Sequence, residues 1–244
     1  IHNELSVMVD LSTYCNAQCP QCHRTDQEDI SKRAYWLPLV QWSLKTFQKR
    51  FPQLSLHAYR NMSLCGTWGD PMMNKDIFKI IEYILSHSNI ILTVNTNGSM
   101  RDETFWWELG MLDYKYNHRL NVIFDIDGIT QEQHATYRVG TELDKVLEHM
   151  QAYSETGATA KAFTIVFKHN EDDVKEIAKL AYSNGACRLY IQPSNRFDKN
   201  PDTFRYIQKN KIKNLHPSTK YTKFKEIILS EEIYNDEKNK MFFF

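Results

Sequence analysis

The sequence predicts an α/β fold built on a parallel sheet. Six strand-like runs alternate with helix-like runs, the order expected when helices connect neighbouring parallel strands. Several strand-like runs are continuously apolar or β-branched, as in Ile90–Val94, which is typical of strands buried on both faces of a sheet. A chain of 244 residues, 42% of them hydrophobic, is long enough for one large α/β domain. A doubly wound sheet and a curved partial barrel both fit this pattern.

Polar side chains gather where the expected strands end. We expect strands at Ser6–Leu11, Met62–Cys65, Ile90–Thr96, Leu120–Ile126, Lys161–Lys168 and Arg188–Gln192. The first strand leads into a group of three cysteines, and the third and fourth strands end in Thr-Asn-Thr-Asn-Gly and Phe-Asp-Ile-Asp-Gly. In folds of this class, ligands bind at the C-terminal ends of the strands, so we expect the functional site there.

Capping residues and apolar stripes predict the first helices. We expect Pro38 in the first turn of a helix that runs toward Phe51. We expect Asn74 to cap the next helix, whose apolar stripe consists of Ile77, Ile80, Ile81 and Ile84. A shorter helix is expected at Asp102–Leu109.

Two further helices are expected in the second half of the chain. Thr141 is expected to cap one that ends near Gly157, with an inward stripe of Val146, Leu147, Met150 and Tyr153. Asn170 or Glu171 is expected to begin the other, which ends at Gly185 and turns inward Val174, Ile177, Ala178 and Ala181. We interpret these stripes as core.

The composition changes after Phe197. Residues 199–244 contain ten Lys and Arg against six Asp and Glu, a formal charge of +4. Their apolar residues fit an amphipathic closing helix that contains Tyr221, Phe224, Ile227, Ile228, Leu229 and Tyr234. We therefore expect a core domain at 1–198 and a short C-terminal helical extension or tail at 199–244. The tail is expected to pack across the barrel or to be partly loose, and a partner-binding role is a further possibility.

Charge, hydropathy and cysteine usage narrow the functional classes. The formal net charge is zero, so the sequence shows no clear nucleic-acid footprint. No run of about 18 apolar residues is present, so no membrane span is expected. Five cysteines, three of them tightly grouped, do not resemble a disulfide framework, and a reducing, cytoplasmic location is expected.

The three grouped cysteines are Cys15, Cys19 and Cys22, in a C-x3-C-x2-C spacing. A 4Fe–4S cluster is normally held by four thiolates, so three would leave one iron open. An open metal position is typical of reactive sites. The alternative is a structural zinc site with His23 as the fourth ligand, although adjacent Cys22 and His23 would have to reach the same ion.

A second motif follows the second expected strand. It reads Gly66-Thr67-Trp68-Gly69-Asp70-Pro71, in which Gly69 allows a close backbone approach and Asp70 could accept a hydrogen bond from an ammonium group. Together the triplet and this motif resemble the radical SAM enzymes, which carry a Gly-Gly-Glu-Pro-like segment here that contacts the amino group of S-adenosylmethionine (SAM). Trp68, Asp70 and, within the triplet, Gln21 in place of a frequent aromatic residue depart from the family pattern.

The resemblance covers roughly residues 4–197 and implies a partial (β/α)6 TIM-type barrel. It also implies that SAM chelates the fourth iron of a 4Fe–4S cluster held by the triplet. Polar residues at later strand ends are then expected to bind SAM or line the pocket, and the cofactor-binding candidates are Gly69, Asp70, Pro71, Asn95, Asn97, Asp125, Arg138, Lys168 and Gln192. Arg138 matches an arginine that could pair with the SAM carboxylate. No catalytic residue is assigned.

The resemblance implies a radical SAM enzyme that receives one electron from a flavodoxin- or ferredoxin-like donor. The electron cleaves SAM to a 5′-deoxyadenosyl radical, which abstracts hydrogen from a substrate. The Phe124–Arg138 pattern is most similar to the SPASM or twitch branch, so a peptide or protein substrate is expected. Only Cys187 follows Cys65, so the sequence lacks that branch's auxiliary-cluster cysteines. The alternatives are a small metabolite or nucleotide as substrate, and a non-catalytic metal-bearing interaction module.

Overall fold

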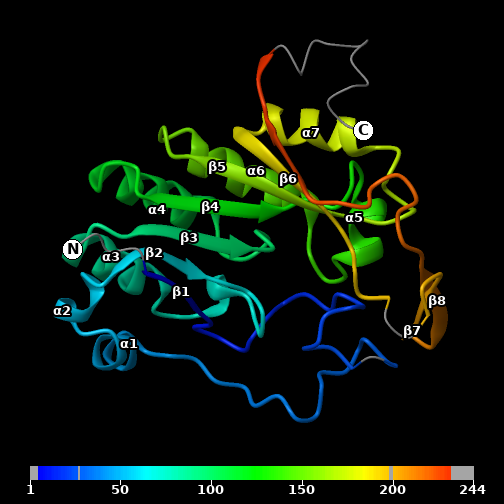
Figure 1. The fold of residues 1–244 in the computed structure, drawn as a ribbon, viewed down its shortest axis with the longest axis horizontal. Coiled ribbons are helices and arrows are strands. Elements are labelled where there is room, and N and C mark those ends of the chain that lie inside the picture. Colours follow the sequence, from blue (N-terminus) through cyan, green and yellow to red (C-terminus); the bar gives the residue numbers. More distant parts are fainter. Residues whose placement is uncertain (1–4, 27, 198–199, 232–244) are drawn as a thin grey trace.

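A computed structural model describes residues 5–26, 28–197 and 200–231 (Figure 1). Its main sheet has seven strands in the order β1-β2-β3-β4-β5-β6-β9, with β1 to β6 parallel and β9 antiparallel to β6. The strands are β1 Leu5–Val9, β2 Tyr59–Leu64, β3 Ile91–Thr96, β4 Leu120–Asp125, β5 Ala160–Val166, β6 Ala186–Pro193 and β9 Lys225–Ile228. The six predicted strands are confirmed, and their sequential order is that of a partial (β/α) barrel rather than a doubly wound sheet.

Helices cover one face of this sheet (Figure 1). They are α1 Leu44–Arg50, α2 Gln53–Leu56, the 3-10 turn η1 Pro71–Met73, α3 Ile77–His87, α4 Glu103–Lys115, α5 Gln131–Tyr137, α6 Leu143–Ser154 and α7 Val174–Ser183. The apolar stripes predicted for α3 and α7 are fully buried. The start of the helix predicted at Asp102–Leu109 is confirmed, since Asp102 caps α4, but its predicted end is wrong because α4 continues to Lys115. The short helices α2 and α5 had no sequence prediction, because four to seven residues carry too little periodicity.

The apolar composition of the strands predicted burial on both faces of the sheet, and this prediction is wrong for β4 and β5. In β4 and β5, buried and partly exposed residues alternate strictly. The buried set packs under the helices, whereas the other set, which includes Ile123 and Phe163, faces the open side of the sheet. An open half-barrel explains this difference, since no second layer of helices closes its inner face among the described residues.

Four predicted helix starts are wrong, because Pro38 lies in an extended segment and the three predicted cap residues bond to connecting segments instead. The segment after Pro38 runs extended beside the chain that follows β1, where the Trp42 amide donates to the Leu11 carbonyl, and α1 starts only after Ser43. The Asn74 side chain donates to the carbonyls of Leu11 and Trp42. The Thr141 hydroxyl bonds to Arg138 and His134, and the Asn170 side chain accepts from the Phe167 amide. The Asn74 contacts are tertiary, so local capping rules miss them, whereas Thr141 and Asn170 bond to residues three to seven positions earlier, in the turns that precede α6 and α7.

The C-terminal segment forms strands, and the predicted closing helix is wrong for its described part. Phe204–Gln208 (β7) and Lys211–Leu215 (β8) form an antiparallel hairpin, and β9 joins the edge of β6. Edge strands expose unpaired backbone groups, and pairing with β9 covers those of β6. An Arg188–Glu226 ion pair joins the two strands. Tyr234, also assigned to that helix, lies outside the described residues. Among the described residues, no helix is long and apolar enough to cross a membrane.

Glu171 links the segment before β9 to the end of β5 through hydrogen bonds. Its carboxylate is buried and accepts hydrogen bonds from the Ser218 hydroxyl at 2.8 Å and the Thr219 amide at 2.7 Å, and it also pairs with Lys168. Burial alone raises the pKa of Glu171, but the hydrogen bonds from Lys168, Ser218 and Thr219 dominate and lower it to about 2. The ionised form therefore stabilises the fold above the unfolded pKa, and this stabilisation is lost as the pH falls through the folded pKa.

We predict that Glu171→Gln lowers the free energy of unfolding at pH 7. A pKa shift from 4.5 to about 2 corresponds to at most roughly 3 kcal/mol. Urea denaturation of wild type and variant should show a difference that shrinks between pH 4.5 and 2, where the wild-type carboxylate becomes protonated. Glu176→Gln, which removes an exposed i,i+3 pair with Lys179, is the control and should change stability by less than about 0.5 kcal/mol. A pH-independent difference would contradict this account of Glu171.

Candidate functional site

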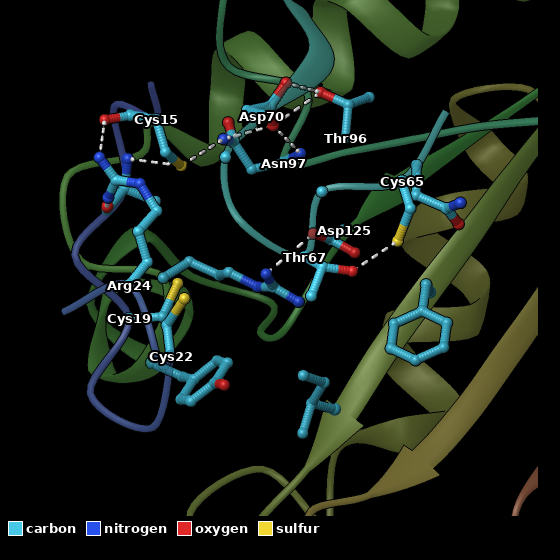
Figure 2. Close-up of a pocket in the computed structure, with 18 of the residues that line it drawn as sticks. Cys15, Cys19, Cys22, Arg24, Cys65, Thr67, Asp70, Thr96, Asn97 and Asp125 are labelled. Atoms are coloured by element: carbon cyan, nitrogen blue, oxygen red, sulfur yellow. Dashed lines mark hydrogen bonds and ion pairs between the residues drawn. The ribbon is translucent and has the colours of Figure 1, made fainter. Parts of the chain in front are cut away.

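The three grouped cysteines line one cavity at the C-terminal ends of the parallel strands (Figure 2). The cavity has a volume of about 280 Å³. The loop that carries the cysteines, residues 10–26, follows β1, and the rest of the wall comes from the ends of β2 to β5 and the segment after β6. The lining residues are Cys15, Ala17, Cys19, Cys22, Arg24, Cys65, Gly66, Thr67, Gly69, Asp70, Asn95, Thr96, Asn97, Asp125, Tyr137, Arg138, Phe163, Ile165 and Arg196.

Short backbone turns and one arginine shape the cysteine loop. The Cys22 amide donates to the Cys19 carbonyl at 3.0 Å, and the Ala17 amide donates to the Cys15 sulfur at 3.3 Å. The Arg24 guanidinium donates to the carbonyls of Thr13, Ala17 and Cys15. Arg24 therefore holds both ends of the loop and places a positive charge beside the thiols, a role that the sequence analysis missed although Arg24 lies two residues after the triplet.

Burial disfavours the ionised form of the Cys15 and Cys19 thiols. Burial, followed by the charge of Asp70, raises the pKa of Cys15 to about 12, and burial likewise raises the pKa of Cys19. A thiolate at such a position requires a cationic partner, which a metal centre supplies when it binds. The thiols are free of disulfides and open to the cavity, so the donor set fits a thiolate-ligated cluster.

The zinc alternative finds no support in the geometry. Within the part of the chain that the structure describes, no three Cys, His, Asp or Glu side chains are placed to hold a single ion. Figure 2 shows the sulfurs of Cys19 and Cys22 pointing the same way and that of Cys15 farther off, beside Asn97. A 4Fe–4S cluster binds each thiolate at a different iron, so it suits separated thiols better than a single ion does.

Asp70 is a buried carboxylate of the cavity wall that accepts several hydrogen bonds. Its carboxylate accepts hydrogen bonds from the Met72 amide at 2.8 Å, the Thr96 hydroxyl at 2.9 Å, and the amide and side chain of Asn97 at 2.7 Å each. Burial raises the pKa of Asp70, and hydrogen bonds from the Asn97 and Met72 amides oppose that rise. Because all its partners donate, the carboxylate joins the end of β2 to the end of β3.

Asn97 and Gly69 extend this connection to the cysteine loop. The Asn97 side chain also donates to the Asn16 side chain at 2.8 Å and lies 3.8 Å from the Cys15 sulfur. A Cβ atom on Gly69 would lie 2.3 Å from the Ser12 carbonyl oxygen and 2.6 Å from that of Tyr14. Gly69 therefore allows a close approach of two protein segments, whereas the sequence analysis expected it to admit a ligand.

Asp125 and Arg138 form a buried ion pair in the cavity wall. The Arg138 guanidinium lies 2.8 Å from Asp125 and 2.5 Å from Asp127, and only 11% of its side chain is exposed. Burial raises the pKa of Asp125 to about 7, although the charge of Arg138 opposes this shift. His134 accepts from the Asp127 amide, and burial lowers the pKa of this histidine to about 4, which keeps it neutral near pH 7. Arg138 thus already has two carboxylate partners.

Gln21 links the cysteine loop to the segment after β6. This side chain is 1% exposed, and it donates to the Arg196 carbonyl at 2.8 Å and accepts from the Ser194 hydroxyl at 2.6 Å. The Arg196 guanidinium in turn donates to the Gln21 carbonyl at 2.9 Å. The sequence analysis noted Gln21 only as a departure from the family pattern, and it missed Arg196.

The structure brings most of the predicted site residues together. The three cysteines line the cavity with six of the nine predicted cofactor-binding residues: Gly69, Asp70, Asn95, Asn97, Asp125 and Arg138. Pro71, Lys168 and Gln192 do not line it. Pro71 begins η1, Lys168 pairs with Glu171, and the Gln192 side chain donates to the Pro193 carbonyl. Tyr137, Phe163 and Ile165 are lining residues that carried no sequence signal beyond apolar periodicity.

Comparison with known proteins identifies the family. A sequence profile of the Radical SAM superfamily matches residues 9–181. No curated protein sequence matches the chain.

Solved structures with the same fold agree with this match. They include Streptococcus suis SuiB bound to S-adenosylmethionine, with a TM-score of 0.60 and 14% identity over 76% of this chain and 40% of that one. The protein anSMEcpe with bound AdoMet has a TM-score of 0.60 and 18% identity over 78% and 49% of the two chains. Methylornithine synthase PylB has a TM-score of 0.51 and 13% identity over 75% and 51%. The chain thus spans about half or less of each of these proteins, and at these identities the likeness shows a shared fold.

We predict that Asp70→Asn destabilises the protein even without any cofactor. The amide NH2 group of asparagine would face donors, which leaves a buried N–H without an acceptor and costs about 2 kcal/mol. Urea denaturation of the cofactor-free variant measures this loss. Asp144→Asn, at an exposed position in the first turn of α6, is the control and should stay within about 0.5 kcal/mol of wild type. Equal stability of the two variants would show that Asp70 does not hold the site together.

Proposed function

Because the chain belongs to the radical SAM superfamily, whose enzymes use a 4Fe–4S cluster and SAM, we propose that Cys15, Cys19 and Cys22 hold such a cluster in this cavity. Held by these three thiolates, the cluster would supply the one-electron reduction that cleaves the sulfonium C–S bond of SAM, and the resulting 5′-deoxyadenosyl radical would take hydrogen from a substrate. The observation that carries this proposal is the convergence of the triplet with Asp70, Asn97 and Arg138 on one cavity. Fold and sequence motifs thereby point to the same place.

The polar wall opposite the thiols is proposed to bind SAM. Asn95 and Asp125 have polar groups at the cavity for the ribose and methionine moieties. Arg138 lies close enough to Cys19 to lower its pKa, which suits contact with the SAM carboxylate beside the cluster. The carboxylate of Asp125 must then share this guanidinium with the ligand.

The Gly69-Asp70-Pro71 turn is proposed to position the site rather than to contact SAM through its side chains. The Asp70 carboxylate already accepts from four protein donors. Its amide donates to the Tyr14 carbonyl at 2.8 Å, which keeps the turn against the cysteine loop. The arrangement fixes the loop at the distance from β2 and β3 that the cavity requires.

A peptide or protein is the proposed substrate. Three of the similar structures contain peptides: SuiB bound to precursor peptide SuiA, and anSMEcpe with bound AdoMet and either Cp18Cys or Kp18Cys peptide. The open inner face of the half-barrel, reached from the cavity through Phe163 and Ile165, leaves room for an extended chain. A small-molecule substrate is the second candidate, since methylornithine synthase shares the fold.

The test is anaerobic reconstitution of wild type and Cys19→Ala with iron and sulfide, followed by addition of dithionite and SAM. We expect about four irons per wild-type chain and formation of 5′-deoxyadenosine. The variant should lose at least half of the iron and more than 100-fold of the SAM cleavage rate, because one of its three thiolates is gone. Cys187→Ala removes a half-buried thiol of β6 that does not line the cavity, and it should behave as wild type.

Two results would overturn the proposal. If Cys19→Ala retained SAM cleavage, the assignment of the three cysteines as cluster ligands would be wrong. Stoichiometric zinc in the wild type, without SAM cleavage, would favour a non-catalytic metal-bearing module.

A further inference from the structure

The hairpin of β7 and β8 carries an unusual charge pattern. Residues 204–215, here the basic hairpin, contain four cations and no acidic residue: Arg205, Lys209, Lys211 and Lys213. All four side chains are exposed. None of them lies within 4.0 Å of a carboxylate in the parts of the chain that the structure describes. This local charge contrasts with the zero net charge of the whole chain.

The basic hairpin is a rigid element rather than a loose tail. Lys209 and Asn210 form its two-residue turn with φ values of 49° and 59°, the left-handed conformations of the tight turn that fits twisted strands. The edge of β7 also pairs with the chain after the cysteine loop, where the Ile207 amide donates to the Glu28 carbonyl at 2.7 Å and the Ile30 amide donates to the Ile207 carbonyl at 3.1 Å.

The buried side of the basic hairpin packs on the cysteine loop. Tyr206 and Leu215 belong to a small apolar cluster with Ala17, Cys19 and Ile30, against which Cys15 and Cys22 also pack. Figure 1 shows the hairpin beside the blue segment that follows β1. Lys211 and Lys213 extend from the same face as Tyr206 and Leu215, and Arg205 extends from the other face, so the exposed cations belong to an element that packs on the loop proposed to hold the cluster.

No residue of the basic hairpin lines the cavity. Tyr206 and Leu215 therefore contact the cysteine loop without forming part of the cavity wall. A partner on the hairpin could approach the cluster without obstructing the SAM cavity. A substrate, in contrast, has to enter that cavity to meet the reactive carbon of SAM.

We propose that the basic hairpin is the docking surface for an acidic one-electron donor protein of the flavodoxin type. The inference rests on the proposed function, because it requires a cluster behind Cys15, Cys19 and Cys22. Its cations attract an acidic surface over a distance of about 10 Å at 0.1 M salt, which speeds encounter and orients the partner. Ile207 and Ile212, which are 38% and 58% exposed and pair across the two strands, supply an apolar contact on the face that also carries Arg205.

The step that this docking serves is a single electron transfer. The donor flavin passes from hydroquinone to semiquinone, and the cluster is reduced from the 2+ to the 1+ state. No bond of the hairpin changes. Its contribution is to the rate of association and to the distance between flavin and cluster.

The test compares a protein donor with a small one. Stopped-flow measurements follow cluster reduction in the reconstituted full chain by flavodoxin hydroquinone and, separately, by dithionite. We expect Lys209→Glu/Lys211→Glu/Lys213→Glu to slow reduction by flavodoxin at least tenfold at low salt and to flatten its salt dependence. Reduction by dithionite should change less than twofold, which also shows that the cluster and fold are intact.

The matched control is Lys45→Glu/Lys49→Glu/Lys79→Glu, which makes the same change in net charge at exposed lysines of α1 and α3. It should keep the wild-type rate with flavodoxin to within about threefold, since distant charges are screened. Equal slowing in both triple variants, or none in the hairpin variant, would overturn the proposal.

A nucleic-acid role is tested in parallel with a fluorescent single-stranded 20-nucleotide DNA. Tight binding at 0.15 M salt that only the hairpin variant loses, together with an unchanged flavodoxin rate, would overturn the proposal in favour of nucleic acid. Failure of SAM cleavage with dithionite in the wild type would instead reject the proposed function, so the two failures are distinguishable.

Discussion

The Asp70 carboxylate is the interaction on which the rest of the site depends. It accepts from Met72 on the turn after β2 and from Thr96 and Asn97 at the end of β3. Asn97 then reaches the cysteine loop through Asn16. A buried carboxylate is costly unless donors surround it, so the strand ends and the loop have to assemble together around this group. The position of the thiols therefore depends on the order of the strands and on the hydrogen-bonded carboxylate of Asp70.

Charge balance gives the site its second constraint. Burial makes ionisation of the Cys15 and Cys19 thiols unfavourable. The charge of Arg24 lowers the pKa of Cys15, and the charge of Arg138 lowers that of Cys19. Arg138 is neutralised by Asp125 and Asp127, and Arg24 is occupied with backbone carbonyls. A metal centre supplies the positive charge that the thiolates still need. Binding of the cluster and ordering of the loop are therefore expected to be coupled.

Periodicity and turn chemistry predicted the six core strands, the stripes of α3 and α7, and the cysteine triplet, because these depend on residues close in sequence. Thr141 was wrong as a helix cap because it bonds inside the turn before α6. Asn74 and Asn170 were wrong because they bind residues distant in sequence, which local rules do not see. The same limit hid Arg196, whose place at the cavity depends on its hydrogen bonds to Gln21, 175 residues away. The C-terminal segment was predicted to form a closing helix. Residues of that helix instead form β9, which pairs with the open edge of β6, and this edge is a tertiary feature that the local sequence does not show.

The most direct test of the account is electron paramagnetic resonance of the reconstituted, dithionite-reduced protein before and after SAM is added. Three thiolate ligands with one open iron predict a four-iron signal in the reduced state whose g values change when SAM binds, because the ligand enters the coordination shell. A four-iron signal that SAM leaves unchanged would contradict the account, since it would mean that the cavity beside the triplet is not the place where SAM meets the cluster.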